Sequence, residues 1–143
     1  MKSTSTVALI IGMWVFSGWG WEITQAAEPS VGSSFEELCL QQASLSEEVR
    51  KTVEVLLEAA GTSDCELAAN NLLTRTELDL TGKGITDITP ISELTNLEVL
   101  NLSYNQITDI TPISELTNLK ELDLYVNQIT DITPISELTN LKE

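Results

Sequence analysis

Ile-Thr-Asp-Ile-Thr-Pro-Ile-Ser-Glu-Leu-Thr-Asn occurs three times in this chain, at residues 85–96, 107–118 and 129–140. Each copy begins 22 residues after the one before it. A fixed period of this length is typical of a solenoid, in which each unit buries its apolar side against its neighbours. The units span residues 75–96, 97–118 and 119–140, and a fourth begins at Leu141. The repeat predicts that the C-terminal half is a stacked array, so its function depends on what its surface binds.

Within each unit the apolar spacing changes from that of a strand to that of a tight helical coil. In the second unit Leu100 and Leu102 alternate with outward positions, as in a strand that buries one face. After Asn105 the isoleucines recur every three residues, which suits a short helical return along the far side. We expect Pro112 at the first position of this coil and Thr111 as its cap.

The spacing Leu-x-x-Leu-x-Leu-x-x-Asn-x-Ile-x-x-Ile resembles the leucine-rich repeat. The 22-residue length and the Thr-Asp-Ile-Thr-Pro segment resemble the internalin class of bacterial surface proteins, over residues 75–140. This resemblance implies an α/β fold, a right-handed solenoid with a short parallel sheet on its concave face. It also implies that Asn105 and Asn127 form a ladder that satisfies backbone groups inside the turns. In the first unit Lys83 replaces this asparagine and Arg75 replaces the leading leucine, so we expect that unit to differ.

Residues 34–74 have the pattern of a helical N-terminal cap for the array. Ser34, Ser46 and Asp64 are placed to cap three amphipathic helices, and Gly61 is placed to end the second. The third of these helices carries Leu67 among its apolar residues. Because the end unit of an array exposes an apolar cross-section, we expect these helices to cover the first repeat.

The first 33 residues differ from the rest of the chain. Lys2 precedes an apolar run over residues 7–21, and Ala26 and Ala27 offer a small-residue cleavage site. This order predicts a signal peptide at residues 1–27, followed by a linker at residues 28–33. The alternative is an uncleaved anchor, but the run is shorter than the ~20 residues that span a bilayer. We therefore expect a secreted, periplasmic or cell-surface protein without stable membrane insertion after cleavage.

Both cysteines, Cys39 and Cys65, follow the predicted signal peptide. An exported protein meets an oxidising compartment, so an even pair predicts a disulfide. Closing this loop would stabilise the fold by about 3.5 kcal/mol in the chain-entropy model. A redox or metal-binding pair is the alternative, but the spacing of the two cysteines suits it poorly and it has no partner ligands.

The composition disfavours several classes of function. The formal charge is -15, from 22 acidic and 7 basic residues, whereas nucleic-acid binding needs clustered lysine and arginine. The chain has no histidine, the usual general base and the commonest zinc ligand. We expect no enzymatic activity and no cofactor. Acidic residues could serve a carboxylate-based hydrolase, but this chain has many equivalent acidic pairs and nothing singles one out as catalytic. Equivalent acidic residues of the three units form two columns, which are interpreted as solvated surface or, alternatively, as calcium ligands. The columns are Asp87, Asp109 and Asp131, and Glu93, Glu115 and Glu137.

The second and third units differ at five of their 22 positions, and all five lie in the first eight. Side chains that alternate with the buried leucines point onto the concave face. We predict a protein-binding surface there, with Tyr104 and Tyr125 supplying aromatic area. The alternative is that the sequence drifted after duplication at positions that packing does not restrain. The candidate binding residues are Glu77, Asp79, Val99, Asn101, Ser103, Tyr104, Glu121, Asp123 and Tyr125.

The C-terminal end of the array begins a fourth unit at Leu141. We expect Ile129, Ile132, Ile135, Leu138 and Leu141 to face solvent, since an apolar edge with no cap invites pairing. The leading hypothesis is a secreted, non-enzymatic module that binds a protein through its concave face. The alternative is a shortened or uncapped array with a structural role, which self-associates through this edge and has no dedicated partner.

Overall fold

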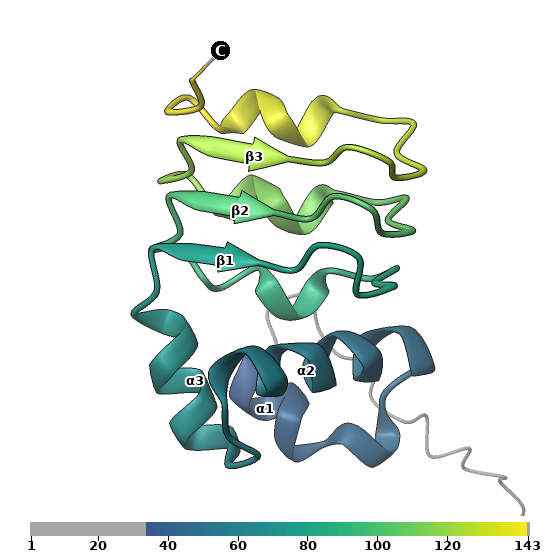
Figure 1. Ribbon diagram of the computed structural model, residues 1–143, viewed down its shortest axis with the longest axis vertical. Helices are drawn as coiled ribbons and strands as arrows, with labels where there is room; N and C mark the ends of the chain where they lie inside the picture. The colour runs from purple at the N-terminus through teal and green to yellow at the C-terminus, as the bar shows by residue number, and fades with distance from the viewer. Residues whose placement is uncertain (1–33, 143) are drawn as a thin grey trace, which may run out of the picture.

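The computed structural model describes residues 34–142, so the predicted signal peptide and linker lie outside the described residues. Three helices come first: α1 (Phe35–Leu40), α2 (Glu47–Ala60) and α3 (Cys65–Leu73). Three strands follow, β1 (Glu77–Asp79), β2 (Val99–Asn101) and β3 (Glu121–Asp123). Figure 1 shows the strands stacked in order above the helices. The arrangement is a leucine-rich-repeat solenoid with an N-terminal helical cap, as the sequence predicts.

The cap helices begin and end where the local sequence predicts. The side chains of Ser34, Ser46 and Asp64 each accept a hydrogen bond from a backbone N–H in the first turn of α1, α2 and α3. Gly61 ends α2 with a φ of 73°, a left-handed conformation that favours glycine. One detail differs, because Leu67 is 59% exposed although the apolar pattern of α3 includes it.

A disulfide joins Cys39 in α1 to Cys65 at the start of α3, as predicted. It ties the first cap helix to the third, with the two Cα atoms 5.7 Å apart. The cross-link therefore fixes the cap as one unit, on which the first repeat can pack.

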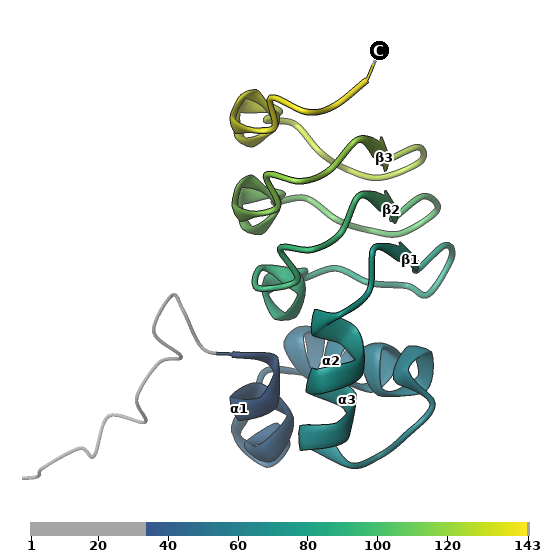
Figure 2. The ribbon, with the colours of Figure 1, turned by 90° about the vertical axis from the view of Figure 1, so that its left-hand side faces the viewer.

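The three strands form one parallel sheet in the order β1-β2-β3. Leu78 pairs with Leu100, and Leu100 with Leu122, so the register equals the 22-residue period. Each strand returns through a short 3-10 helix on the opposite side of the stack: η2 (Thr89–Ile91), η3 (Thr111–Glu115) and η4 (Thr133–Glu137). In Figure 2 the strands line one side of the stack and these helices the other.

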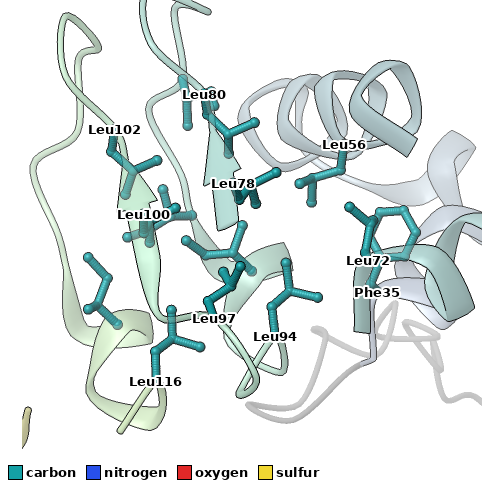
Figure 3. Close-up of a cluster of buried hydrophobic side chains, with 14 of the residues drawn as sticks. Phe35, Leu56, Leu72, Leu78, Leu80, Leu94, Leu97, Leu100, Leu102 and Leu116 are labelled. Carbon is teal, nitrogen blue, oxygen red and sulfur yellow. The ribbon is translucent and has the colours of Figure 1, made fainter. Parts of the chain in front are cut away.

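The core runs without interruption from the cap into the repeats. Phe35, Leu56 and Leu72 of the cap face Leu78 and its neighbours, as Figure 3 shows. Buried polar contacts reinforce this junction. Thr52 in α2 is fully buried and donates its hydroxyl proton to the Asp87 carbonyl oxygen at 2.6 Å.

The first unit differs from the others because it contacts helices. The Arg75 guanidinium donates to the Ala59 carbonyl oxygen at 2.7 Å, where the other units place a buried leucine. Lys83 stands where the asparagine of the ladder would be, and its ammonium lies 3.3 Å from a Glu58 carboxylate oxygen. Both departures from the repeat pattern therefore attach the array to its cap.

Two asparagine ladders hold the units together. Asn105 accepts from the Ile85 N–H at 3.0 Å and donates to the carbonyl oxygens of Leu80 and Leu102, so it bridges the first and second units. Asn127 makes the equivalent bonds one unit later. This ladder confirms the prediction.

The second ladder was not predicted. It lies at the last position of each unit, where an asparagine side chain donates to a backbone carbonyl oxygen of the preceding turn. The three bonds are Asn96 to Leu73 at 2.6 Å, Asn118 to Thr95 at 2.7 Å and Asn140 to Thr117 at 2.8 Å.

Two predictions about the repeats were wrong. Thr111 is the first residue of η3 rather than its cap, and Pro112 is the second. A carboxylate oxygen of Asp109 accepts from the Thr111 N–H at 2.8 Å, so the aspartate supplies the capping bond. At the C-terminal end Leu138 is 4% exposed instead of facing solvent, and Ile129, Ile135 and Leu141 are partly buried against the core. Ile132, at 69% exposed, does face solvent as predicted.

Candidate functional site

The concave face of the sheet carries six of the predicted binding residues in two aligned rows. Glu77, Val99 and Glu121 are register partners across the three strands. Asp79, Asn101 and Asp123 form the second row. The outer strands present exposed carboxylates, whereas the central strand presents half-buried neutral side chains. The face is therefore acidic at its margins and neutral along its middle.

A shallow depression of about 260 Å³ lies on this face between β2 and β3. The outward-facing side chains that line it are Val99 and Asn101 of β2 and the carboxylates Glu121 and Asp123 of β3. The lining residues are Val99, Leu100, Asn101, Glu121, Leu122 and Asp123. The depression is open to solvent rather than enclosed.

The second row has a structural role that the sequence analysis missed. The side-chain oxygens of Asp79, Asn101 and Asp123 each accept from the backbone N–H two residues later, at 2.9 to 3.0 Å. These bonds form the bend that ends each strand. The hydroxyl and N–H of Thr81 lower the pKa of the Asp79 carboxyl group. Asp and Asn side chains are well suited to this bend, which explains why the varying position alternates between them.

Ser103 is a corrected prediction. It was expected to point outward, but it is 4% exposed. Its hydroxyl donates to the Asn101 side-chain oxygen at 2.7 Å and lies 3.5 Å from the Thr81 hydroxyl. The bend after the strand turns this side chain along the sheet, so Ser103 supports the row instead of offering a contact surface.

An exposed apolar patch lies where β2 and β3 pass into their turns, and we call Tyr104, Tyr125 and Val126 the turn patch. Their side chains are 58%, 66% and 51% exposed. The two rings meet edge to face, with centroids 5.6 Å apart and an interplanar angle of 78°. Such a geometry is favourable for aromatic pairs and holds both rings in place without burying them.

The backbone under the turn patch is strained. Tyr104 has a φ of 57° and Val126 a φ of 53°, while Gly82 occupies the same repeat position with a φ of 66°. Left-handed backbone costs roughly 1–2 kcal/mol for a residue with a Cβ atom. The second and third units thus place large exposed side chains at a position where the first unit has the unstrained residue.

One of the five differences between units is explained by pairing. Glu98 and Lys120 occupy the second position of adjacent units, and the Lys120 ammonium lies 2.8 Å from a Glu98 carboxylate oxygen. Opposite charges on neighbouring rows attract, whereas two copies of Glu98 would repel. Neither partner binding nor drift is needed to account for this substitution.

Local structure explains the aspartate column and one member of the glutamate column. Asp87, Asp109 and Asp131 each accept from the N–H two residues later at 2.8 Å, which shapes the start of each 3-10 helix. The Thr111 hydroxyl and N–H lower the pKa of Asp109, and those of Thr133 lower the pKa of Asp131. Glu93 accepts from the Phe35 N–H, so it caps α1. Within residues 34–142 no three acidic or cysteine side chains group closely enough to hold a metal ion.

Across residues 34–142 the longest helix is α2, and none of the helices there combines the length and the apolar character that a bilayer span requires.

Comparison with known proteins supports the repeat assignment. Residues 76–116 match the family model described as leucine rich repeats in two copies, and residues 118–141 match the leucine rich repeat model. An internalin (inlF) from Listeria monocytogenes is 37% identical, with a TM-score of 0.58, over 65% of this chain and 28% of its own. Internalin C2 from the same species is 47% identical, with a TM-score of 0.49, over 52% of this chain and 33% of its own. The chain therefore spans a third or less of either protein. No curated protein shows significant similarity to it.

Proposed function

We propose that this chain, an internalin-like leucine-rich repeat protein, is an exported module that binds a protein partner through its concave face. Leucine-rich repeats of this kind are protein-interaction modules and are typically non-enzymatic. In this chain the sheet face and the turn patch make the contact with the partner, and the helical cap supports them.

The turn patch is the observation that carries this proposal. Tyrosine is enriched at protein interfaces because one ring offers both apolar area and a polar hydroxyl. Tyr104 and Tyr125 are the most exposed aromatic side chains within residues 34–142, and they adjoin the sheet face. A strained backbone that presents exposed side chains is more typical of a binding surface than of a framework.

Capture of a partner tests the surface. In a pull-down from the protein's native environment, Tyr104→Ala with Tyr125→Ala should lower the yield of any specifically bound protein at least tenfold. The matched control is Leu40→Ala with Leu67→Ala, which removes two comparably exposed apolar side chains from the cap. Equal capture by the tyrosine variant and the wild-type chain would exclude the concave face as the contact surface.

Export is the second part of the proposal. The apolar run at residues 7–21 and the Cys39–Cys65 disulfide both suit an oxidising compartment. Expression of the full chain followed by mass measurement of the mature product tests this: we expect cleavage after Ala26 or Ala27 and recovery outside the cytoplasm. A full-length product that stays in the cytoplasm would contradict export.

Self-association is a second candidate function, favoured by the C-terminal end. Ile132 is 69% exposed beside the half-buried Ile129 and Ile135. However, a twofold pairing of β3 centred on Leu122 would place Glu121 opposite Asp123 of the second copy, and like charges directly opposite are destabilising. Sedimentation at several concentrations distinguishes the two: the binding proposal expects a monomer, and a concentration-dependent dimer would favour edge assembly.

A further inference from the structure

We infer that the concave face receives an arginine-bearing segment of its protein partner, with the guanidinium group between the turn patch and the β3 carboxylates. The inference rests on the proposed function and adds the chemistry of the partner. It is carried by the exposed turn patch and by the depression lined by Val99 and the β3 carboxylates, and the charges around them indicate the occupant.

The turn patch offers π faces and apolar area at one end of the sheet. Tyr104 and Tyr125 belong to different units, yet the Tyr104 N–H donates to the Tyr125 carbonyl oxygen at 2.8 Å, so the two turns are held side by side. The edge-to-face contact of the rings leaves both more than half exposed. A planar cation can stack on such a ring and gain attraction from its negative face.

The carboxylates adjoin this patch along the chain. A side-chain oxygen of Asp123 accepts from the Tyr125 backbone N–H at 2.9 Å, so this carboxylate lies beside the backbone that carries the ring. Asp123 and Glu121 also line the depression, together with the outward-facing Val99. A side chain with an apolar stem and a positive head can lie against Val99 and reach these carboxylates.

The outward positions of the three strands carry acidic and neutral side chains only. The nearest lysines by repeat position are each engaged elsewhere: Lys120 pairs with Glu98, and Lys83 pairs with Glu58. An anionic segment would therefore meet uncompensated carboxylates, whereas a cationic one would be attracted.

Arginine suits the site better than lysine. Its guanidinium group is planar, so it stacks on an aromatic ring while its edge donates to a carboxylate in a bidentate manner. A lysine ammonium is a compact and strongly hydrated charge that cannot do both. The site should therefore bind an arginine-bearing segment more tightly than a lysine-bearing one. Diffuse attraction to an acidic protein would not produce this difference.

The probe is the peptide acetyl-Gly-Arg-Leu-Arg-Gly-amide, titrated into the isotope-labelled chain at low salt and followed by amide chemical shifts. We expect the largest shifts at Leu122, Tyr104 and Tyr125. Peptides with lysine or neutral citrulline in place of arginine should bind at least threefold and tenfold more weakly, respectively. Equal binding of the citrulline peptide, or shifts centred on the cap helices, would overturn the inference.

A charge-matched pair of variants separates the site from overall net charge. The site variant carries Glu77→Gln, Asp79→Asn, Glu121→Gln and Asp123→Asn, and asparagine keeps the bend because Asn101 already forms it in the second unit. The control variant carries Glu54→Gln, Glu66→Gln, Glu115→Gln and Glu137→Gln, all at exposed positions off the sheet face. We expect the site variant to lose peptide affinity at least fivefold more than the control. Equal losses would mean non-specific attraction and would overturn the inference.

Failure of this inference differs from failure of the proposed function. If partner capture depends on the tyrosines but the arginine peptide fails to bind at the face, the concave surface is functional and the occupant is not basic. If capture is independent of the tyrosines, the proposed function fails as well.

Discussion

The second and third units agree at 17 of 22 positions, yet the same residue is in the core of one and on the surface of the other. Ile110 is 1% exposed, whereas Ile132, at the same repeat position, is 69% exposed. The difference arises because the second unit has a neighbour on both sides and the third has one. In a solenoid, burial is therefore a property of the stack and not of the unit's own sequence.

The largest expected loss of stability comes from replacing the isoleucine of the interior unit. Ile110→Ala removes a buried side chain and leaves a cavity, so it should lower the free energy of unfolding by about 2–5 kcal/mol. Ile132→Ala removes an exposed side chain and should change stability by about 0.5 kcal/mol or less. Urea unfolding of the two variants measures both values. Equal losses would mean that Ile132 is covered in solution, for example by a second copy.

The asparagine ladder gives a second comparison between the units, with an expected stability loss of intermediate size. Asn105 is 6% exposed and bridges two units, so Asn105→Ala leaves several buried backbone groups unpaired and should cost about 3 kcal/mol. Asn127 is only half-buried, and water can reach part of its turn, so Asn127→Ala should cost roughly half as much. The Ile85 and Ile107 amides report each loss by hydrogen exchange. A larger cost at Asn127 would contradict the view that the interior units are the more tightly held.

The smallest effect concerns the backbone of the turns. Gly82→Ala should lower the free energy of unfolding by about 1 kcal/mol, since no atom lies within 4 Å of the added Cβ and only the left-handed backbone resists it. Val126→Gly should raise stability by up to about 1 kcal/mol, because it relieves that strain at the price of a more flexible unfolded chain. Thermal unfolding with matched scans measures both signs. A destabilised Val126→Gly variant would show that its side chain makes a stabilising contact.

Much of the fold follows from local signals in the sequence. Ser34, Ser46 and Asp64 cap their helices because a short polar side chain before an apolar helical pattern can reach the free N–H groups of the first turn. The 22-residue period also predicts the register of the sheet, since each strand pairs with its copy one period away. These signals depend on residues close in sequence or on exact repetition.

The candidate site was predicted less completely. Alternation along a strand places Asn101 outward correctly, but it fails at Ser103, because the side-chain bond from Asn101 ends the strand and turns the chain. The role of Asn118 was missed for a related reason, because its side chain bonds to a carbonyl oxygen of the preceding unit, whose position is set only once the turns are stacked. The bond from Asp109 is local, to the N–H two residues later, and was missed because the sequence pattern favoured Thr111 as the cap.

The sequence by itself determined the repeat, its period, the cap helices and the cysteine pair, because periodicity and capping are local properties of the chain. Only the tertiary structure decided which copies of an identical residue are buried, which varying positions are exposed, and how Tyr104 and Tyr125 meet. The physical reason is that exposure and side-chain pairing depend on neighbouring units across the stack. The repeated block is alike in all three units, and its surroundings are not.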